Sequence, residues 1–165
     1  MLRFLNRGVA ALIAVAALAM GVAAPAVFAA DLSLTAANVA PGTNAVLETG
    51  TAGEALTAGK QVYKKAADKK WYLADVNSAT AEVRVASATV VTGLASGQPV
   101  VVQKGGTITI GGTVANGTVY FLSGTAGGVR PAADNTTGDY PQVIGMGVSA
   151  TQVELNYSLS APSAL

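Results

Sequence analysis

Residues 95–122 read ASGQPVVVQKGGTITIGGTVANGTVYFL, and this stretch decides the fold class. It holds three short runs rich in valine, threonine, isoleucine and aromatic residues, which fit a half-buried sheet surface: Gln98–Gln103, Thr107–Ile110 and Thr118–Leu122. The glycines between and beside the runs permit the positive φ angles of tight turns: Gly105, Gly106, Gly111, Gly112 and Gly117. The stretch therefore predicts three strands joined by turns, with positive φ at Gly105-Gly106, Gly112 and Gly117.

The composition extends this prediction to the rest of the chain. Only 12% of the 165 residues are charged and 5% are aromatic, whereas 19 are glycine, which favours strands and turns over a helical bundle. One domain is expected, since domains commonly have about 100 to 150 residues. Many short strands with frequent turn signals predict an all-β fold, a small β-barrel or a sandwich.

The residue types that are missing exclude common chemistry. The sequence has no cysteine and no histidine, and so lacks disulfides, a thiolate nucleophile, the usual general base and the commonest metal ligand. From Asp31 onward, eight basic residues stand against nine acidic ones, whereas nucleic-acid binders usually have a basic surface. We expect neither an enzyme nor a nucleic-acid partner, but a surface that contacts other proteins.

Residues 1–29 have the layout of a secretory signal peptide. Arg3 and Arg7 precede an uncharged run from Gly8 to Ala30, and a β-branched Val27 and a small Ala29 at the two positions that a signal peptidase reads favour cleavage after Ala29. The alternative is a retained hydrophobic helix that anchors the chain in a membrane, because 23 residues at about 1.5 Å each can cross a hydrocarbon core of about 30 Å.

The remaining chain divides into an arm (residues 30–53), a β domain (54–160) and a tail (161–165). The arm has few large side chains, so we expect it to be extended, with one or two brief strands, and to order against a partner subunit. Open sheet edges would be covered in the same contact. We therefore expect a homo-oligomer, with a trimer as the favoured state.

Within the β domain, Gln61–Tyr63 and Trp71–Leu73 predict a hairpin, with a helix over Ala66–Ala74 as the alternative. The region from Ser123 to Asp139 is rich in glycine, proline and aspartate and predicts a surface excursion. Three further segments are interpreted as strands: Glu82–Val91, Tyr140–Val148 and Gln152–Leu159.

Three features resemble functional motifs. The first is a set of lysines interleaved with aromatic residues, a composition also found in single-strand binding faces: Lys60, Tyr63, Lys64, Lys65, Lys69, Lys70, Trp71 and Tyr72. We interpret these lysines as a guard against edge-to-edge aggregation, with nucleic-acid binding as the alternative.

The second feature, Gly145–Ala150, satisfies G-x-G-x-x-A, but a strand pattern follows it, so a hairpin turn is favoured over a cofactor loop. The third, Asp134–Asp139, offers oxygen ligands but lacks EF-hand spacing, so a turn is favoured over a calcium site. We assign no catalytic, cofactor-binding or metal-binding residues.

The order of strand and turn signatures resembles a known family. The pieces that carry the resemblance are Thr51–Tyr63, Trp71–Asp75, Ser78-Ala79, Ala95–Val100, Gly117–Ser123, Ala126–Gly128, Pro131, Asp134 and Gly138–Tyr140. Over residues 34–159 the chain is similar to the small capsid decoration proteins, also called cement or head-fibre proteins, of tailed bacteriophages.

The resemblance implies a non-enzymatic virion protein with a β-barrel or β-tulip-like domain. It further implies a position on the outside of a capsid, as a homotrimer that clamps neighbouring major capsid protein subunits with its N-terminal arm. The alternative, which residues 1–29 favour, is a secreted bacterial surface or fibre protein with the same β domain.

Overall fold

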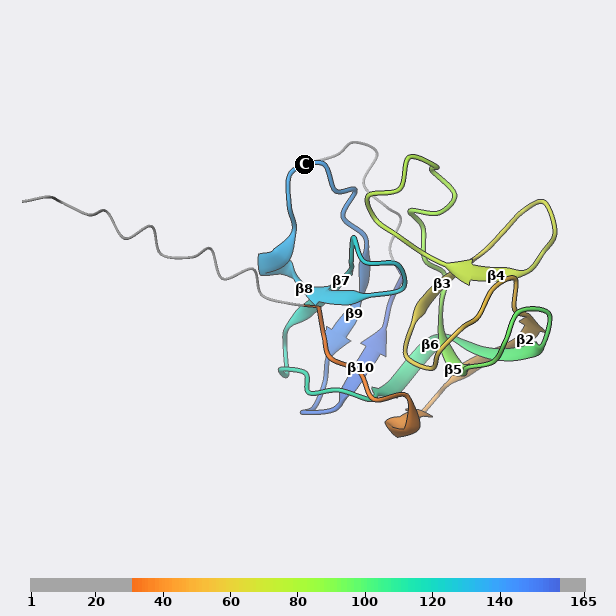
Figure 1. Cartoon of the computed structure of the whole chain (residues 1–165). Helices are drawn as coiled ribbons and strands as arrows, with labels where there is room; N and C mark the ends of the chain where they lie inside the picture. Colours follow the sequence, from red (N-terminus) through yellow and green to blue (C-terminus); the bar gives the residue numbers. More distant parts are fainter. Residues whose placement is uncertain (1–30, 158–165) are drawn as a thin grey trace, which may run out of the picture.

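The computed structural model describes residues 31–157, so the predictions for residues 1–29 and for the tail 161–165 lie outside the described residues. The described chain is an all-β domain in which ten antiparallel strands form one strongly curled, half-barrel sheet (Figure 1). The strands are β1 (Val39–Pro41), β2 (Val46–Thr51), β3 (Gln61–Lys64), β4 (Trp71–Leu73), β5 (Ala88–Thr92), β6 (Pro99–Ile110), β7 (Val119–Leu122), β8 (Val129–Pro131), β9 (Val143–Gly147) and β10 (Gln152–Leu155). Two short 3-10 helices accompany them, η1 (Ala36–Asn38) and η2 (Ala132–Asp134).

The sheet is organised around β6, which is 12 residues long. Its first half pairs with β5 and β2, and its second half pairs with β10 and β1. The strand order is β4-β3-β5-β6-β10-β9-β7-β8, so β6 joins the two ends of the sheet. Residues 31–157 include no helix that is long and apolar enough to cross a membrane.

The predicted turn at Gly105-Gly106 is wrong, because the two flanking runs belong to one strand. The register between β2 and β6 shifts beside Gly105, as at a β-bulge, and the chain continues. Gly106 has a φ of 79°, and a Cβ there would collide with the carbonyl oxygen of Asn44. This glycine therefore lets the turn before β2 approach β6.

The other turn glycines are only partly as predicted. Gly111 and Gly117 have positive φ, at 82° and 77°, but Gly105 and Gly112 do not. A Cβ on Gly112 would lie 2.6 Å from the carbonyl oxygen of Ser33. Gly112 is therefore needed for a close approach of two backbones, which turn patterns do not reveal.

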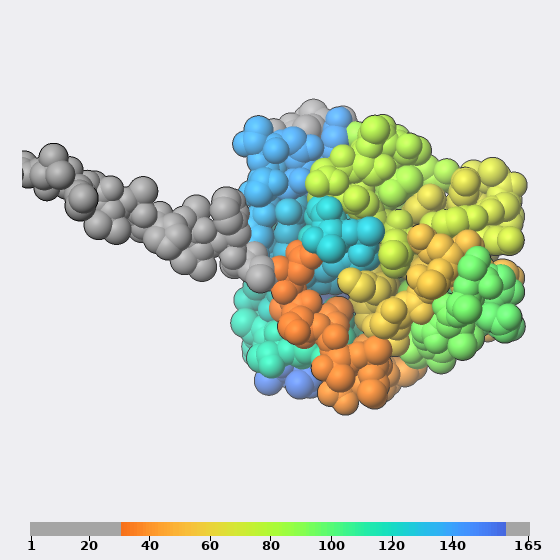
Figure 2. Space-filling model, viewed as in Figure 1, coloured from red at the N-terminus to blue at the C-terminus, as the bar shows by residue number. Residues whose placement is uncertain are grey.

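The segment before β3, which the sequence predicts to lie against a partner subunit, makes its strand pairings within the same chain. Its two strands, β1 and β2, pair with β6 of the same chain. Before β1, the backbone N–H of Leu32 donates to Val129 O, and that of Thr35 donates to Gly111 O, both at 2.8 Å. In Figure 2 this segment, coloured orange, lies across the face of the domain.

Two hydrophobic clusters fill the curled sheet, one at each half of β6. The Trp71 cluster consists of Ala52, Leu56, Val62, Trp71, Ala88, Val90, Val100 and Val102. The Ile108 cluster consists of Tyr63, Ala74, Val76, Ala86, Ile108, Ile110, Val114, Tyr120, Leu122, Val129, Ile144, Val153 and Leu155. β6 contributes alternate side chains to both clusters, as the period of a strand requires.

The remaining strand predictions meet mixed outcomes. The β3–β4 hairpin is confirmed, with Val62 opposite Leu73, and so is the turn between β9 and β10. The region 82–91 is strand only from Ala88, and β10 ends at Leu155. The excursion 123–139 is not all surface, because it contains β8 with its buried Val129 and Arg130.

Candidate functional site

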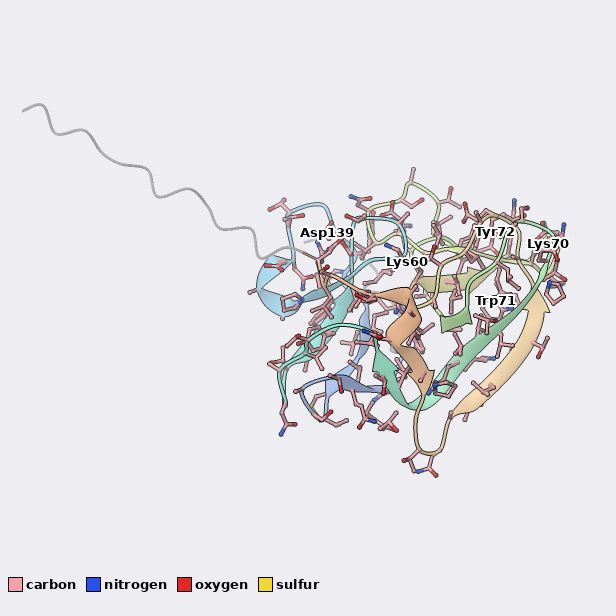
Figure 3. All side chains as sticks on the ribbon, turned by 60° about the horizontal axis from the view of Figure 1, so that its bottom comes forward. Lys60, Lys70, Trp71, Tyr72 and Asp139 are labelled. Carbon is pink, nitrogen blue, oxygen red and sulfur yellow. The ribbon has the colours of Figure 1, made fainter. Side chains whose placement is uncertain are left out.

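The β3–β4 hairpin carries the lysines that the sequence singles out. The connecting turn closes through two backbone hydrogen bonds between Lys65 and its partners Lys69 and Lys70, each 2.9 Å long. Lys69 adopts a φ of 60° in this turn. Figure 3 shows Lys70 and Tyr72 at one edge of the domain, whereas Lys60 lies nearer its middle.

The aromatic residues of the hairpin do not form an exposed stacking surface. Trp71 is 1% exposed and Tyr63 is 8% exposed, so both belong to the hydrophobic clusters. Tyr72 lies partly exposed, with the ammonium of Lys65 5.2 Å from its ring centre. Successive bases would need several accessible rings, and this hairpin presents one.

Tyr72 also forms a charged contact at the hairpin turn. Its hydroxyl donates to Asp68 Oδ2 at 2.7 Å, which lowers the pKa of Asp68 and raises that of Tyr72. A Cβ on Gly53 would overlap the Tyr72 ring, so the chain after β2 lies directly against it. The β3–β4 hairpin therefore packs against the chain at the end of β2.

β2 is an exposed edge strand that no sequence motif marks as a site. Within residues 31–157 its pairing partner is β6 alone, apart from a bridge at Ala52 just beyond its end. Val46 is 58% exposed and Leu47 is 49% exposed. In a half-buried strand, apolar and polar residues alternate, whereas Val46 and Leu47 are consecutive apolar residues. This break in alternation is the sequence signal that could have indicated an exposed apolar edge.

Charged residues surround the middle of β2. Glu48 accepts from Lys64 Nζ at 2.6 Å and from Lys104 Nζ at 3.2 Å. The hydrogen bond from Lys64 is the main reason that the pKa of Glu48 lies below its ordinary value. The β2 edge therefore combines two exposed apolar side chains, Val46 and Leu47, with an ion-paired Glu48.

A second apolar patch lies on the outer face of β7, β9 and the turn after β9. Val119 and Met146 are register partners, and they are exposed along with Val148. A shallow groove of about 280 Å³ runs beside them, lined by Val119, Val143, Gly145, Met146, Glu154 and Asn156.

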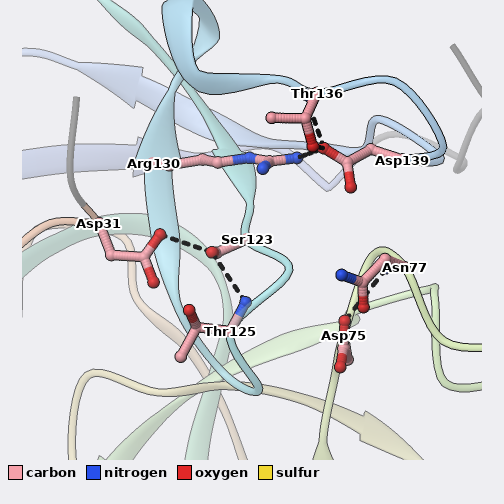
Figure 4. A network of polar contacts seen from close by, with 8 residues as sticks. All are labelled: Asp31, Asp75, Asn77, Ser123, Thr125, Arg130, Thr136 and Asp139. Atoms are coloured by element: carbon pink, nitrogen blue, oxygen red, sulfur yellow. Dashed lines mark hydrogen bonds and ion pairs between the residues drawn. The ribbon is translucent and has the colours of Figure 1, made fainter. Parts of the chain in front are cut away.

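The third feature is a polar pocket of about 230 Å³, defined by Asp31, Asn77, Ser123, Gly124, Thr125, Arg130, Asp134, Thr136 and Asp139. Ser123 directly follows β7, β8 supplies Arg130, and the turn after η2 supplies Thr136 and Asp139. In Figure 4, Arg130 and Asp139 lie on one side of the pocket, opposite Ser123 and Asn77.

A buried ion pair forms one wall of this polar pocket. Arg130 Nη2 donates to Asp139 Oδ2 at 2.5 Å, and the side chains are 7% and 3% exposed. Burial alone would raise the pKa of Asp139, but hydrogen bonds from Thr136 N, Thr136 Oγ1 and Arg130 lower it below its ordinary value. Asp139 is therefore a carboxylate at neutral pH.

The structure shows where the predicted motifs lie. The turn 134–139 directs Asp139 toward Arg130, and the described chain has no group of three metal-ligating side chains. The G-x-G-x-x-A stretch forms the β9–β10 hairpin, where Val148 N donates to Gln152 O at 2.9 Å. Arg130 has no distinguishing sequence pattern, because the glycine- and aspartate-rich residues around it predict a surface region.

Comparison with known proteins found no matching family model and no matching characterised protein. The capsid-protein resemblance in the strand and turn signatures therefore stays a prediction.

Proposed function

We propose that this chain is a non-enzymatic virion structural protein that decorates and stabilises the capsid of a bacteriophage. The ordered strand and turn signatures from Thr51 to Tyr140 support the family, and the curled all-β domain agrees with them in fold class. In this proposal the half-barrel is a β-tulip-like scaffold, with residues 30–53 as its extended N-terminal arm and a hydrophobic helical segment before it.

The observation that carries the proposal is the exposed β2 edge. A strand edge that presents Val46 and Leu47 to solvent is a template for pairing with another chain, and soluble proteins commonly blunt such edges. The patch around Met146 gives the domain a second apolar contact surface on another part of the sheet. Two contact surfaces suit a protein that touches both its own copies and a capsid.

In the proposed assembly, the β2 edge joins copies of the chain into a homotrimer, and the Met146 patch contacts the major capsid protein. The lysines around Glu48 would restrict which strands can pair there, since charges near an edge discourage unspecific association. Nucleic acid has no part in this assembly, and a membrane is contacted only through residues 1–30 if they are retained.

A specific observation favours a second candidate function. Arg3, Arg7 and the uncharged run from Gly8 to Ala30 have the layout of a signal peptide, which a protein assembled in the cytoplasm does not need. The second candidate is a secreted bacterial surface or fibre protein that uses the same β domain.

Fractionation of a culture that produces the chain distinguishes the two functions. Phage particles would be purified on a density gradient, and the chain and its N-terminus would be identified by mass spectrometry. The proposal predicts that the chain bands with the particles in constant ratio to the major capsid protein. Recovery only from the cell envelope or the medium, with residues 1–29 removed, would contradict it.

A further inference from the structure

Large apolar side chains are exposed at three places on the described part of the chain. Two of these places are the β2 edge and the Met146 patch, and the proposed assembly gives each of them a partner. The third is Leu94, which is 44% exposed in the loop between β5 and β6. A single exposed leucine is ordinary, but Leu94 forms one wall of a groove.

The Leu94 groove has a volume of about 610 Å³ and an apolar lining. Four alanines line it together with Leu56, Val91 and Leu94, and its described lining includes no charged side chain. Burying an unpaired charge is costly, whereas burying apolar surface is favourable. The groove therefore suits aliphatic side chains rather than lysine or glutamate.

The two loops that form the Leu94 groove are held together by hydrogen bonds. The backbone N–H of Leu56 donates to Leu94 O, and Ser96 Oγ donates to Gly53 O, both at 2.9 Å. A Cβ on Gly93 would lie 2.6 Å from Leu56 O, so the two backbones are in close contact. The groove is thus formed before a partner arrives, which reduces the ordering cost of binding.

A trimer that is joined through β2 needs a second, different surface on every copy. Two identical β2 edges can face each other about a twofold axis, which gives a dimer. A ring of three is instead built from contacts in which one surface binds another surface of the next copy. The β2 edge must therefore be received by another part of the neighbouring chain.

The two ends of the sheet are not free to receive it, because the chain itself covers them. At β4, the backbone N–H of Leu73 donates to Glu54 Oε1 at 2.6 Å, and at β8 that of Leu32 donates to Val129 O at 2.8 Å. The groove beside the Met146 patch includes the carboxylate of Glu154, and this patch contacts the capsid in the proposed assembly. Among the large apolar side chains exposed in residues 31–157, this leaves Leu94.

We propose that Val46 and Leu47 of one copy insert into the Leu94 groove of the next copy. Val46 is 58% exposed and Leu47 is 49% exposed, so both side chains would lose contact with water in the interface. Each copy completes the groove of its neighbour, and three such contacts close a ring. This inference rests on the proposed homotrimer and identifies the surface that receives the β2 edge.

Cross-linking of introduced cysteines tests the contact, because the chain has no cysteine of its own. In the double variant Thr49→Cys with Ala95→Cys, one thiol lies on β2 and the other at the groove, while Val46, Leu47 and Leu94 stay intact. A short bismaleimide added to the full-length double variant should give bands of two and three linked chains on a denaturing gel. Neither single variant should be linked, because each contact joins two different surfaces.

A second pair of variants tests the groove without cysteines. Leu94→Lys places a charge in the apolar groove and should raise the concentration at which half of the trimer dissociates about tenfold. The matched control Met146→Lys alters a side chain of similar exposure, 46% against 44%, and should leave the trimer unchanged. Light scattering over a dilution series measures both, and melting temperatures show whether the variants are folded.

Four results would overturn the proposal. The first is a trimer that the double variant does not link and that Leu94→Lys leaves intact, which would remove the Leu94 contact but leave the trimer standing. The second is an unaltered chain that is monomeric, which would remove the trimer as well. The third is linked dimers from Thr49→Cys alone, since two β2 edges would then face each other. The fourth is linking of Thr49→Cys to Met146→Cys but not to Ala95→Cys, since the Met146 patch would then receive β2.

Discussion

The two halves of β6 serve hydrophobic clusters that differ in make-up. In the Trp71 cluster, one large side chain is surrounded by valine, alanine and a single leucine. The Ile108 cluster instead shares its volume among several isoleucine, leucine and tyrosine side chains. The half of the sheet that carries the exposed β2 edge therefore depends on one residue, whereas the half that carries the polar pocket does not.

Trp71 also lies directly under the proposed assembly edge. A Cβ on Gly50 in β2 would be 2.5 Å from Trp71 Nε1, so the indole packs against the β2 backbone. Packing of the Trp71 cluster and the proposed assembly through β2 are therefore coupled at one end of the molecule. At the other end, packing is coupled to a buried polar network.

The largest effect should come from Trp71→Ala. We expect a loss of about 3–5 kcal/mol in the free energy of unfolding, because a large buried side chain leaves a cavity at the centre of its cluster. The control Ile144→Val in the Ile108 cluster should cost only about 0.5–1.5 kcal/mol. Urea denaturation measures both, and similar losses for the two variants would break the comparison.

The polar end is tested next, by Arg130→Met. The substitution preserves most of the side-chain length but leaves the buried charge of Asp139 with Thr136 as a donor and without a cationic partner, so we expect a loss of about 3 kcal/mol. Removal of both charges, in Arg130→Met with Asp139→Leu, should restore part of that loss. A single variant as stable as the unaltered chain, by urea denaturation, would show that the ion pair is not structural.

The buried ion pair should also make stability depend on pH, because the pKa of Asp139 is lowered in the folded state. A lowered folded pKa stabilises the protein above the ordinary carboxyl pKa of about 4, and this stability is lost as the pH falls through the folded value. The free energy of unfolding should therefore fall below about pH 4, and less steeply in Asp139→Asn. If the free energy of unfolding fell equally steeply with decreasing pH in both chains, Asp139 would not be the cause of the acid sensitivity.

The smallest effects distinguish two glycines with positive φ. Gly117→Ala should lower the free energy of unfolding by about 1 kcal/mol, because alanine is strained in the left-handed backbone conformation. The loss should be no larger, because no atom lies near the new Cβ. Gly106→Ala should cost about 2 kcal/mol, since strain adds to a collision with Asn44 O. Equal melting temperatures for the two variants would argue against the close approach at β6.

The sequence predicted what depends on local pattern. Runs rich in valine, threonine, isoleucine and aromatic residues indicate the strands, and Gln61–Tyr63 with Trp71–Leu73 indicates the β3–β4 hairpin. It could not predict that Gly105-Gly106 lies inside a strand, because a glycine pair suits a bulge as well as a turn. The difference is set by Asn44, which is distant in sequence.

Tertiary contacts also explain buried polar side chains that the sequence pattern does not reveal. Arg130 is buried because Asp139, nine residues later, compensates its charge. Tyr157 lies against Thr89 and Gln61, whose side chains come from other strands: its hydroxyl is 2.6 Å from Thr89 Oγ1 and 2.9 Å from Gln61 Oε1. Burial raises the pKa of that hydroxyl, although the contact with Thr89 acts in the opposite direction. A pattern of neighbouring residues in the sequence does not predict such contacts.

The exposed β2 edge is the centre of the functional account, and light scattering tests it most directly. For a chain that starts at Asp31, at tens of micromolar, we expect the mass of a trimer. The variant with Val46→Lys and Leu47→Lys should have the mass of a monomer, because charge at an edge strand opposes pairing. A monomer before substitution, or an oligomer that both lysines leave unchanged, would contradict the account.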